Sequence, residues 1–263
     1  MNPLLELTGL TRRYAGLVAV DGVDLRVAPG TVHAVIGPNG AGKTTLFNLI
    51  SGIVAPSEGR IVFGGRDITA FPPHRRARLG IARSFQNIRV FGSMTVLENV
   101  LTGLHVRLGA SLAAIVGRRP RMRREEAEAV VRAREVLGLV GLAGQAELRS
   151  ASLSYGDQRR LEIARALAPA PLLLLLDEPA AGMNPAETEA LAALVRKIRD
   201  FGTGVLLVEH DMGFVMDLSD RVTVLNFGRR IFEGAPEAVR REPAVIEAYL
   251  GAKLAAQLAR RAG

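Results

Sequence analysis

Eight consecutive residues have the types and spacing that a phosphate-binding loop requires. They fit the pattern G-x-x-x-x-G-K-[ST] in full and are Gly37, Pro38, Asn39, Gly40, Ala41, Gly42, Lys43 and Thr44. The glycines let successive backbone N–H groups point at phosphate oxygens, and the N-terminus of a following helix favours negative charge. Lys43 can reach the β- and γ-phosphates, and the Thr44 hydroxyl can ligate Mg²⁺, with Thr45 expected beside it. The run predicts a site for a nucleoside triphosphate and Mg²⁺.

Two adjacent acids, Asp177 and Glu178, follow the apolar run Leu172–Leu176. At the carboxyl end of a parallel strand, Asp177 would hold Mg²⁺ through its waters, and Glu178 would orient or deprotonate an attacking water. Taken alone, the pair is better interpreted as solvated acids at the start of a helix. Together with the phosphate loop, it predicts hydrolysis of the nucleotide. The sequence contains no Asn-Lys-x-Asp guanine motif, which favours ATP over GTP.

The surrounding pattern predicts the elements that position these residues. Apolar runs predict strands at Leu4–Leu7, Val23–Val27 and Val32–Ile36, with Pro29-Gly30 as a hairpin turn and a helix over Thr44–Ile50. Further strands are expected at 172–176, 205–208 and 221–225, with a helix at 188–199. This alternation predicts an α/β fold with a mostly parallel sheet flanked by helices. Together with the phosphate loop it resembles the P-loop NTPase (RecA-like) type, which implies an additional antiparallel β subdomain.

A change to helical patterning in the middle of the chain predicts an insertion. We expect one domain over 1–263, with a core at 1–92 and 160–242, a helical subdomain at about 93–159 and C-terminal helices at 243–263. Within the insertion, one apolar stripe is expected from Val130, Val131, Val136 and Leu137.

Composition sets broad limits on the function. Hydrophobic residues make up 48% of the 263 residues, which excludes a disordered chain, and the absence of cysteine excludes disulfides and Cys-ligated metals. No signal peptide or spanning apolar run is recognisable, so we expect a cytosolic protein. A net charge of +8 could indicate nucleic acid, an anionic membrane or a solvated surface, and the last is favoured.

The segment from Leu153 to Leu167 begins Leu-Ser-Tyr-Gly-Asp-Gln and stands just before the acidic strand. It resembles the signature sequence, L-S-G-G-Q, of the ABC ATPase family. The resemblance implies a head-to-tail dimer in which Ser154 and Gly156 of one subunit contact the γ-phosphate bound by the other. Tyr155 and Asp157 depart from the pattern, since the family usually has glycine and glutamine there.

Other positions match this family one by one. Gln86 resembles the glutamine that senses Mg²⁺ and water, and His210 resembles the switch histidine that hydrogen-bonds the γ-phosphate. Tyr14 resembles the aromatic that stacks on adenine, the alternative being a partly buried strand residue. Asn184 lies in a dimer-contact loop where Asp is commoner. The resemblance therefore implies a catalytic set of Lys43, Gln86, Glu178 and His210, and Mg²⁺ ligation by Thr44, Gln86 and Asp177.

Nearly the whole chain resembles the LivG type within this family. That type serves importers of branched-chain amino acids, which implies a second ATPase (LivF-like, or the chain itself), two transmembrane permeases and, indirectly, a periplasmic or extracellular solute-binding protein. It also implies a peripheral position on the cytoplasmic side of the membrane. Relatives for urea import or lipopolysaccharide export share parts of the pattern. A soluble nucleic-acid-associated ATPase and a scaffold that binds ATP without cleaving it are rival hypotheses, and no nucleic-acid partner is expected.

Overall fold

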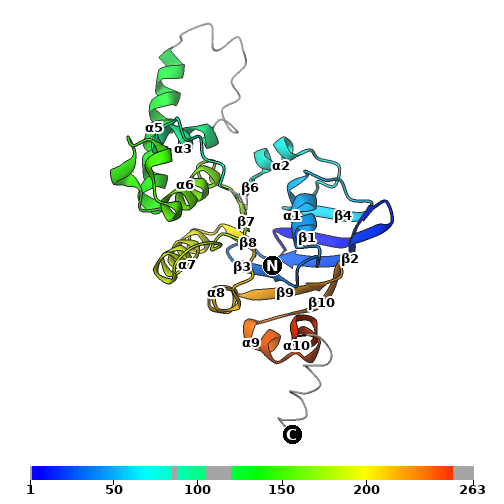
Figure 1. The fold of residues 1–263 in the computed structure, drawn as a ribbon. Helices are drawn as coiled ribbons and strands as arrows, with labels where there is room; N and C mark the ends of the chain where they lie inside the picture. Colours follow the sequence, from blue (N-terminus) through cyan, green and yellow to red (C-terminus); the bar gives the residue numbers. More distant parts are fainter. Residues whose placement is uncertain (1, 85–87, 105–119, 251–263) are drawn as a thin grey trace.

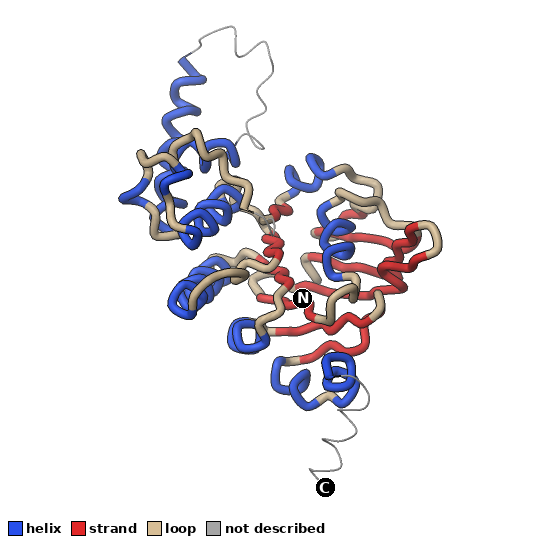
Figure 2. The backbone as a smooth tube through the Cα atoms, viewed as in Figure 1, coloured by secondary structure: helices blue, strands red, loops and turns tan. Residues whose placement is uncertain are grey.

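The computed structural model describes residues 2–84, 88–104 and 120–250 and builds them into two sheets with surrounding helices (Figures 1 and 2). The antiparallel sheet has the order β2-β1-β4-β5. Its strands are β1 (Leu5–Tyr14), β2 (Leu17–Val27), β4 (Glu58–Phe63) and β5 (Arg66–Asp67). The six-stranded sheet has the order β10-β9-β3-β8-β7-β6. Its strands are β3 (Val32–Ile36), β6 (Ile81–Arg83), β7 (Leu173–Asp177), β8 (Gly204–Val208), β9 (Arg221–Asn226) and β10 (Arg229–Gly234).

The pairing of the larger sheet is parallel except at one edge, where β10 runs antiparallel to β9. The carboxyl ends of β3, β7 and β8 therefore lie along one edge, where open α/β sheets bind ligands. The predicted fold class, a mostly parallel sheet with a separate antiparallel sheet, is confirmed.

The described helices fall into three groups (Figure 1). Two follow core strands: α1 (Lys43–Ser51) and α2 (Pro73–Leu79). A separate helical group, at the upper left of Figure 1, contains α3 (Val96–Leu104), α5 (Pro120–Leu139), α6 (Tyr155–Leu167) and short 3₁₀ turns at Ala143–Gln145 and Ser150–Ser152. The remaining helices accompany the later strands: α7 (Pro185–Asp200), α8 (Met212–Leu218), α9 (Pro236–Arg241) and α10 (Pro243–Leu250).

Two hydrophobic cores lie on opposite faces of the six-stranded sheet. The side chains of β3 alternate between them: Val32, Ala34 and Ile36 pack into the core shared with α3, α5, α6 and α7. Val35 faces the other core, which contains the buried side of α1 and the antiparallel sheet. Helix α1 is thus held between the two sheets, and this fixes the loop that precedes it.

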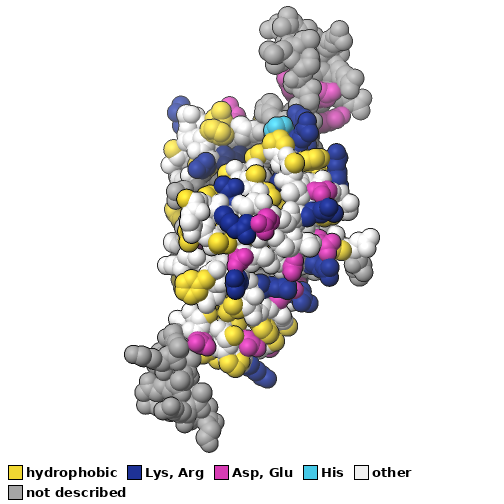
Figure 3. All heavy atoms as spheres, turned by 90° about the vertical axis from the view of Figure 1, so that its right-hand side faces the viewer, with side chains coloured by type: hydrophobic (Ala, Val, Ile, Leu, Met, Phe, Trp, Pro, Cys, Tyr) yellow, Lys and Arg dark blue, Asp and Glu magenta, His cyan; other side chains and the backbone are white. Residues whose placement is uncertain are grey.

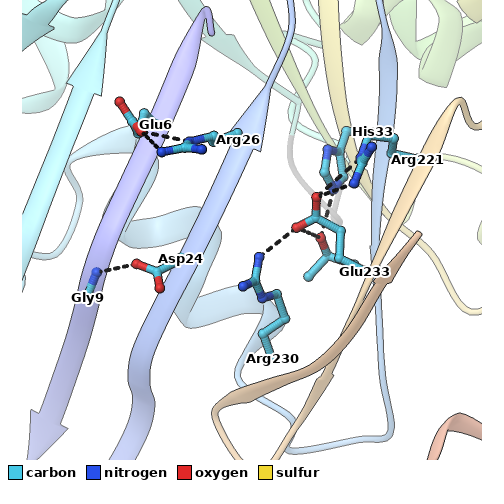
Figure 4. A network of polar contacts seen from close by, with 9 residues as sticks. Glu6, Gly9, Asp24, Arg26, His33, Arg221, Arg230 and Glu233 are labelled. Atoms are coloured by element: carbon cyan, nitrogen blue, oxygen red, sulfur yellow. Dashed lines mark hydrogen bonds and ion pairs between the residues drawn. The ribbon is translucent and has the colours of Figure 1, made fainter. Parts of the chain in front are cut away.

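A buried polar network joins β3 to the antiparallel edge of its sheet (Figure 4). His33 Nε2 lies 2.8 Å from Thr223 Oγ1 on β9, and Thr223 Oγ1 donates to Glu233 Oε2 on β10 at 3.4 Å. Arg221 and Arg230 both form ion pairs with Glu233. Burial of the imidazole lowers the pKa of His33 to about 4. His33 is therefore neutral at physiological pH.

Two expectations about local structure are wrong. Pro29-Gly30 does not close a hairpin, because β2 pairs with β1 in the antiparallel sheet, whereas β3 pairs with β8 and β9 in the other. The turn instead carries the chain from one sheet to the next. Val131 does not belong to the buried stripe of α5, since 59% of it is exposed. Leu137 is buried as expected, Val130 and Val136 are partly buried, and Ala133 joins the stripe.

The face over the antiparallel sheet carries charges of both signs (Figure 3). Arginines there form ion pairs with acids on neighbouring strands, namely Arg13–Glu58, Arg26–Glu6 and Arg60–Asp67. Interspersed charges of this kind are typical of a solvated surface rather than an anion-binding face. Within residues 2–84, 88–104 and 120–250, none of the helices has the length and apolar character that crossing a membrane requires.

Candidate nucleotide site

The phosphate loop connects the end of β3 to the start of α1. Gly42 is the N-cap of α1, at φ 99°, and Gly40 has φ 79°. A Cβ on Gly42 would meet the carbonyl oxygen of Ala19 at 2.3 Å, so only glycine fits this close approach. The loop thus packs closely against β2. Its backbone N–H groups and the N-terminus of α1 can face the same space, as an anion site requires.

Lys43 is the cation of this loop, and only 6% of it is exposed. Its Nζ donates to the carbonyl oxygens of Gly37 at 2.7 Å and Pro38 at 3.0 Å. Burial lowers its pKa, and the nearby carboxylates of Glu178 and Asp177 partly offset this. The ammonium therefore lies folded against its own loop, close to both acids.

Asp177 is the last residue of β7 and is 4% exposed. Its Oδ2 accepts a hydrogen bond from Arg83 Nη2 at 2.7 Å, in an ion pair whose side chains are 8% and 6% exposed. No motif in the sequence marks Arg83 as part of the site. A buried carboxylate needs such a partner, but the spacing of 94 residues gives no local signal of it.

Glu178 follows immediately and has an unusual backbone, with φ 48° at a residue that carries a side chain. Its N–H donates to the carbonyl oxygen of Val208 at 2.9 Å, which ties it to the end of β8. Its Oε1 lies 2.6 Å from Nε2 of His210. The predicted base and the predicted switch histidine therefore meet directly, and this pair can hold a proton between carboxylate and imidazole.

Glu209 is a further acid that the sequence analysis missed. It is 3% exposed, and its two carboxylate oxygens accept hydrogen bonds from the N–H of Ala180 at 2.7 Å and of His210 at 3.0 Å. Burial raises its pKa, while these backbone hydrogen bonds act in the opposite direction. Glu209 thus joins the segment after Glu178 to the segment that carries His210.

A pocket of about 440 Å³ collects most of the predicted residues. Its lining includes Asn39, Gly40, Ala41, Gly42, Lys43, Thr44, Thr45, Glu178 and His210. Gly37 and Pro38 are not in its lining. Tyr14 is not in it either: the Tyr14 ring is 38% exposed, with Arg12 Cζ 4.5 Å from its centroid. Leu17, Val18 and Phe227 supply the apolar part of the lining instead.

Ser154 and Gly156 begin α6, and neither lines this pocket. The Ser154 hydroxyl caps the helix by accepting from the N–H of Asp157 at 3.1 Å. A Cβ on Gly156 would meet Glu187 Oε1 at 2.7 Å, so a larger residue there would displace the Glu187 side chain. The hydroxyl of Tyr155 donates to the carbonyl oxygen of Ala181 at 3.1 Å.

The two polar departures from the signature pattern and the dimer-contact loop have local roles. Asp157 lies in the first turn of α6, where the helix dipole favours an acid, and it pairs with Arg160. Asn184 is the N-cap of α7 and forms a capping box with Glu187. Both residues therefore stabilise helix starts.

The donors at the site fit Mg²⁺, which prefers hard oxygen ligands and is usually held by one or two carboxylates together with substrate phosphates. Asp177 and the Thr44 hydroxyl are donors of this kind. In the described part of the chain, no group of three or more His, Cys, Asp or Glu side chains is arranged so that it could hold a metal ion by itself. Gln86, the third predicted ligand, lies outside the described residues.

Two family models match the sequence. One, described as ABC transporter, matches residues 20–181, and another, described as branched-chain amino acid ATP-binding cassette transporter, matches residues 229–255. The chain is 47% identical to the high-affinity branched-chain amino acid transport ATP-binding protein BraF of Pseudomonas aeruginosa and 45% identical to LivG of Escherichia coli. Each alignment covers 95% of this chain and 98% of the relative. The lipopolysaccharide export system ATP-binding protein LptB of Acidithiobacillus ferridurans is 38% identical over 95% of this chain and 98% of that protein.

Solved structures show the same fold. A nucleotide-free ATP-binding cassette from an ABC transporter superposes with a TM-score of 0.83 at 31% identity, over 94% of this chain and 99% of that chain. The ADP conformation of an ATP-binding cassette of an ABC transporter gives the same TM-score and identity, over 95% of this chain and 100% of that chain.

Proposed function

The chain belongs to the ABC transporter family of ATP-binding proteins, and from this premise we propose that it powers an importer of branched-chain amino acids through a dimer that closes around ATP. As a member of that family it binds and hydrolyses ATP. The solute class is supported by the relatives with the highest identities reported above and by the model matched at residues 229–255. Relatives for lipopolysaccharide export are less similar.

The contact between Glu178 and His210 is the single observation that carries the mechanism. In the proposed reaction, Glu178 orients the attacking water and takes its proton, and His210 donates a hydrogen bond to the γ-phosphate. The loop N–H groups and Lys43 hold the phosphates once Lys43 turns from its own carbonyls toward them. Gln86 is proposed to sense the metal and the water.

Thr44 and Asp177 would hold Mg²⁺, Asp177 through bound water, with Gln86 as a third ligand. When bound, the ion would neutralise charge on the β- and γ-phosphates. Tyr14 is proposed to stack on adenine. Tyr14 itself is outside the pocket lining, whereas Leu17 and Val18 at the start of β2 are in it.

The second half of the site is proposed to come from another subunit. Ser154 is exposed at the N-terminus of α6, where a hydroxyl and a helix dipole suit a γ-phosphate, yet it is remote from the pocket lining of its own chain. A head-to-tail partner, either a LivF-like ATPase or a second copy, would bring its own serine to Lys43.

The permease partners are proposed to dock in a groove of about 630 Å³ between the core and the helical group. The groove is lined by Ile53, Ala77 and Ile81 on the core side and by Phe91 and Ala166 on the other. We accordingly propose that the chain is peripheral to the membrane, on its cytoplasmic side. A solute-binding protein would meet the permeases and not this chain.

Replacing Glu178 by Gln tests the mechanism. The amide of glutamine has nearly the shape of the carboxylate but cannot take a proton from the attacking water. Steady-state phosphate release should therefore fall about 100-fold or more. ATP retention, measured by equilibrium binding, should stay within about twofold, because Glu178 does not bind the phosphates. Glu189→Gln, the same change on the exposed face of α7, serves as the matched control and should hydrolyse ATP normally.

The import function is tested with the chain and its own permeases in vesicles. Leucine uptake should require ATP and stop in the Glu178→Gln variant. Normal hydrolysis by that variant would remove Glu178 from its role. Normal ATP-dependent phosphate release without uptake of leucine, isoleucine or valine would contradict the proposed solute class alone.

A further inference from the structure

Arg83 contacts both elements that carry the proposed metal ligands, β7 with Asp177 and α1 with Thr44. It is the last residue of β6 and pairs with Leu175 on the neighbouring strand β7. Asp177 follows Leu175 by two residues on β7. From there its Nη2 donates to Asp177 Oδ2 at 2.7 Å. Both side chains are at least nine-tenths buried, so water does not screen this pair strongly.

The other terminal nitrogen of Arg83 contacts α1. Its Nη1 donates to Asn48 Oδ1 at 2.7 Å and to Ser51 Oγ at 3.1 Å. Asn48 follows Thr44 by four residues on α1, and residues with that spacing lie on one face of a helix. One guanidinium therefore connects the strand end that carries Asp177 to the helix that carries Thr44.

We propose that Arg83 is a positioning residue for the Mg²⁺ site, holding Asp177 and the Thr44 helix at the separation that the ion requires. This inference rests on the proposed roles of Thr44 and Asp177. The planar fork of arginine is suited to the task, since its two terminal nitrogens bond in two fixed directions; the single ammonium of lysine cannot reproduce both directions. Partners behind metal ligands commonly set metal affinity in this way.

The alternative is a purely structural ion pair, and the chain offers a matched control for it. Arg76 is also an arginine, 1% exposed, and it also contacts α1, through the carbonyl oxygens of Leu49 at 2.6 Å and Ile50 at 2.9 Å. It also donates to the carbonyl oxygens of Thr69 and Phe71, and none of these partners is a carboxylate. Both arginines brace the same helix, but only Arg83 also contacts Asp177.

The test measures Mg²⁺-dependent nucleotide binding without turnover. In a Glu178→Gln background, binding of a fluorescent ATP analogue is followed as Mg²⁺ is titrated, and again in EDTA. Arg83→Gln should raise the half-saturating Mg²⁺ concentration about 10- to 100-fold and leave binding in EDTA within about twofold. Arg83→Lys should give an intermediate requirement. Arg76→Gln should lower the melting temperature without changing the Mg²⁺ requirement.

A double variant separates action through Asp177 from a general loss of structure. If Arg83 acts through that carboxylate, adding Arg83→Gln to Asp177→Asn should weaken Mg²⁺ dependence no further. The inference is overturned if Arg83→Gln titrates like its parent, or if Arg76→Gln shifts the Mg²⁺ requirement equally. Should the parent itself bind the analogue equally well in EDTA and Mg²⁺, the proposed metal site fails, and the role of Arg83 fails with it.

Discussion

Glu178 occupies a backbone conformation that is unfavourable for a residue with a side chain. A φ of 48° costs about 1–3 kcal/mol at a non-glycine residue and persists only where the surroundings impose it. Here the hydrogen bond to Val208 and the contact with His210 impose it. Strain at this residue supports its assignment to the chemistry.

Glu209 should matter for stability as well as for activity. Changing it to Ala removes the acceptor for two backbone N–H groups, and we expect unfolding free energy to fall by about 2 kcal/mol. Phosphate release should fall as well, because His210 and the segment after Glu178 lose their common anchor. Urea denaturation and a phosphate-release assay measure the two effects.

Glu209→Gln is the matched control, since its single amide oxygen can accept from only one of the two N–H groups. Its stability should lie between those of the native chain and the Ala variant. An Ala variant as stable and as active as the native chain would show that water replaces the carboxylate at both N–H groups.

The residues of this site that belong to sequence motifs could be predicted from the sequence. Lys43, Glu178 and His210 meet at one pocket, as expected. Arg83 and Glu209 were missed because their partners are known only after folding: each looks like an ordinary charged residue beside a motif. The roles of Asp157 in the first turn of α6 and of Asn184 as the N-cap of α7 depend likewise on where these helices begin.

At the scale of elements, periodicity predicted strands and helices better than it predicted their partners. The strand at Val32–Ile36 has the predicted bounds, because its apolar run is buried on both faces. Pro29-Gly30 was wrongly predicted to close a hairpin because the residues of a turn show only that the chain turns, and not which strands pair. Strand β2 pairs with β1 because side chains of both strands are buried in the same core. Val131 was misplaced because four apolar residues alone do not fix which face of α5 meets its neighbours.

The strand that carries the phosphate loop should make the fold sensitive to mild acid. His33 faces Thr223, with Glu233, Arg221 and Arg230 as the nearby charged groups. Its pKa is about 4 in the folded chain against about 6.5 when unfolded, so the unfolded state binds the proton more readily. The contribution of neutral His33 to the free energy of unfolding is fully present above its unfolded pKa of about 6.5, and it is lost as the pH falls toward 4. Between pH 7.5 and 5 we expect a loss of about 2 kcal/mol.

The pKa of Glu233 is lowered although burial alone would raise it, because His33 and the two arginines favour its charged form. Its contribution is also lost as pH falls, but it applies below the range of the histidine effect. Urea denaturation at pH 7.5 and 5 should therefore show a smaller difference for His33→Gln, whose amide can still bond Thr223. An unchanged difference would assign the acid sensitivity to other groups.

For the whole molecule, the phosphate loop and the signature segment belong to different bodies of one chain. The loop lies between the two sheets, whereas Ser154 starts α6 in the helical group (Figure 1). The pocket lining includes no residue of α6. The signature is therefore proposed to act on the ATP of another subunit, and two defects placed in different subunits should complement each other.

Lys43→Ala disables the loop and leaves the signature intact, and Ser154→Glu does the reverse by placing a carboxylate against the γ-phosphate. In a dimer of two copies of this chain, each variant alone should be inactive, since both sites carry the same defect. In an equal mixture, about half of the dimers contain one copy of each, and each mixed dimer has one intact site of two. Phosphate release should recover to about a quarter of the native rate. A site completed within one chain would give no recovery at any mixing ratio, because neither variant then contains a working site.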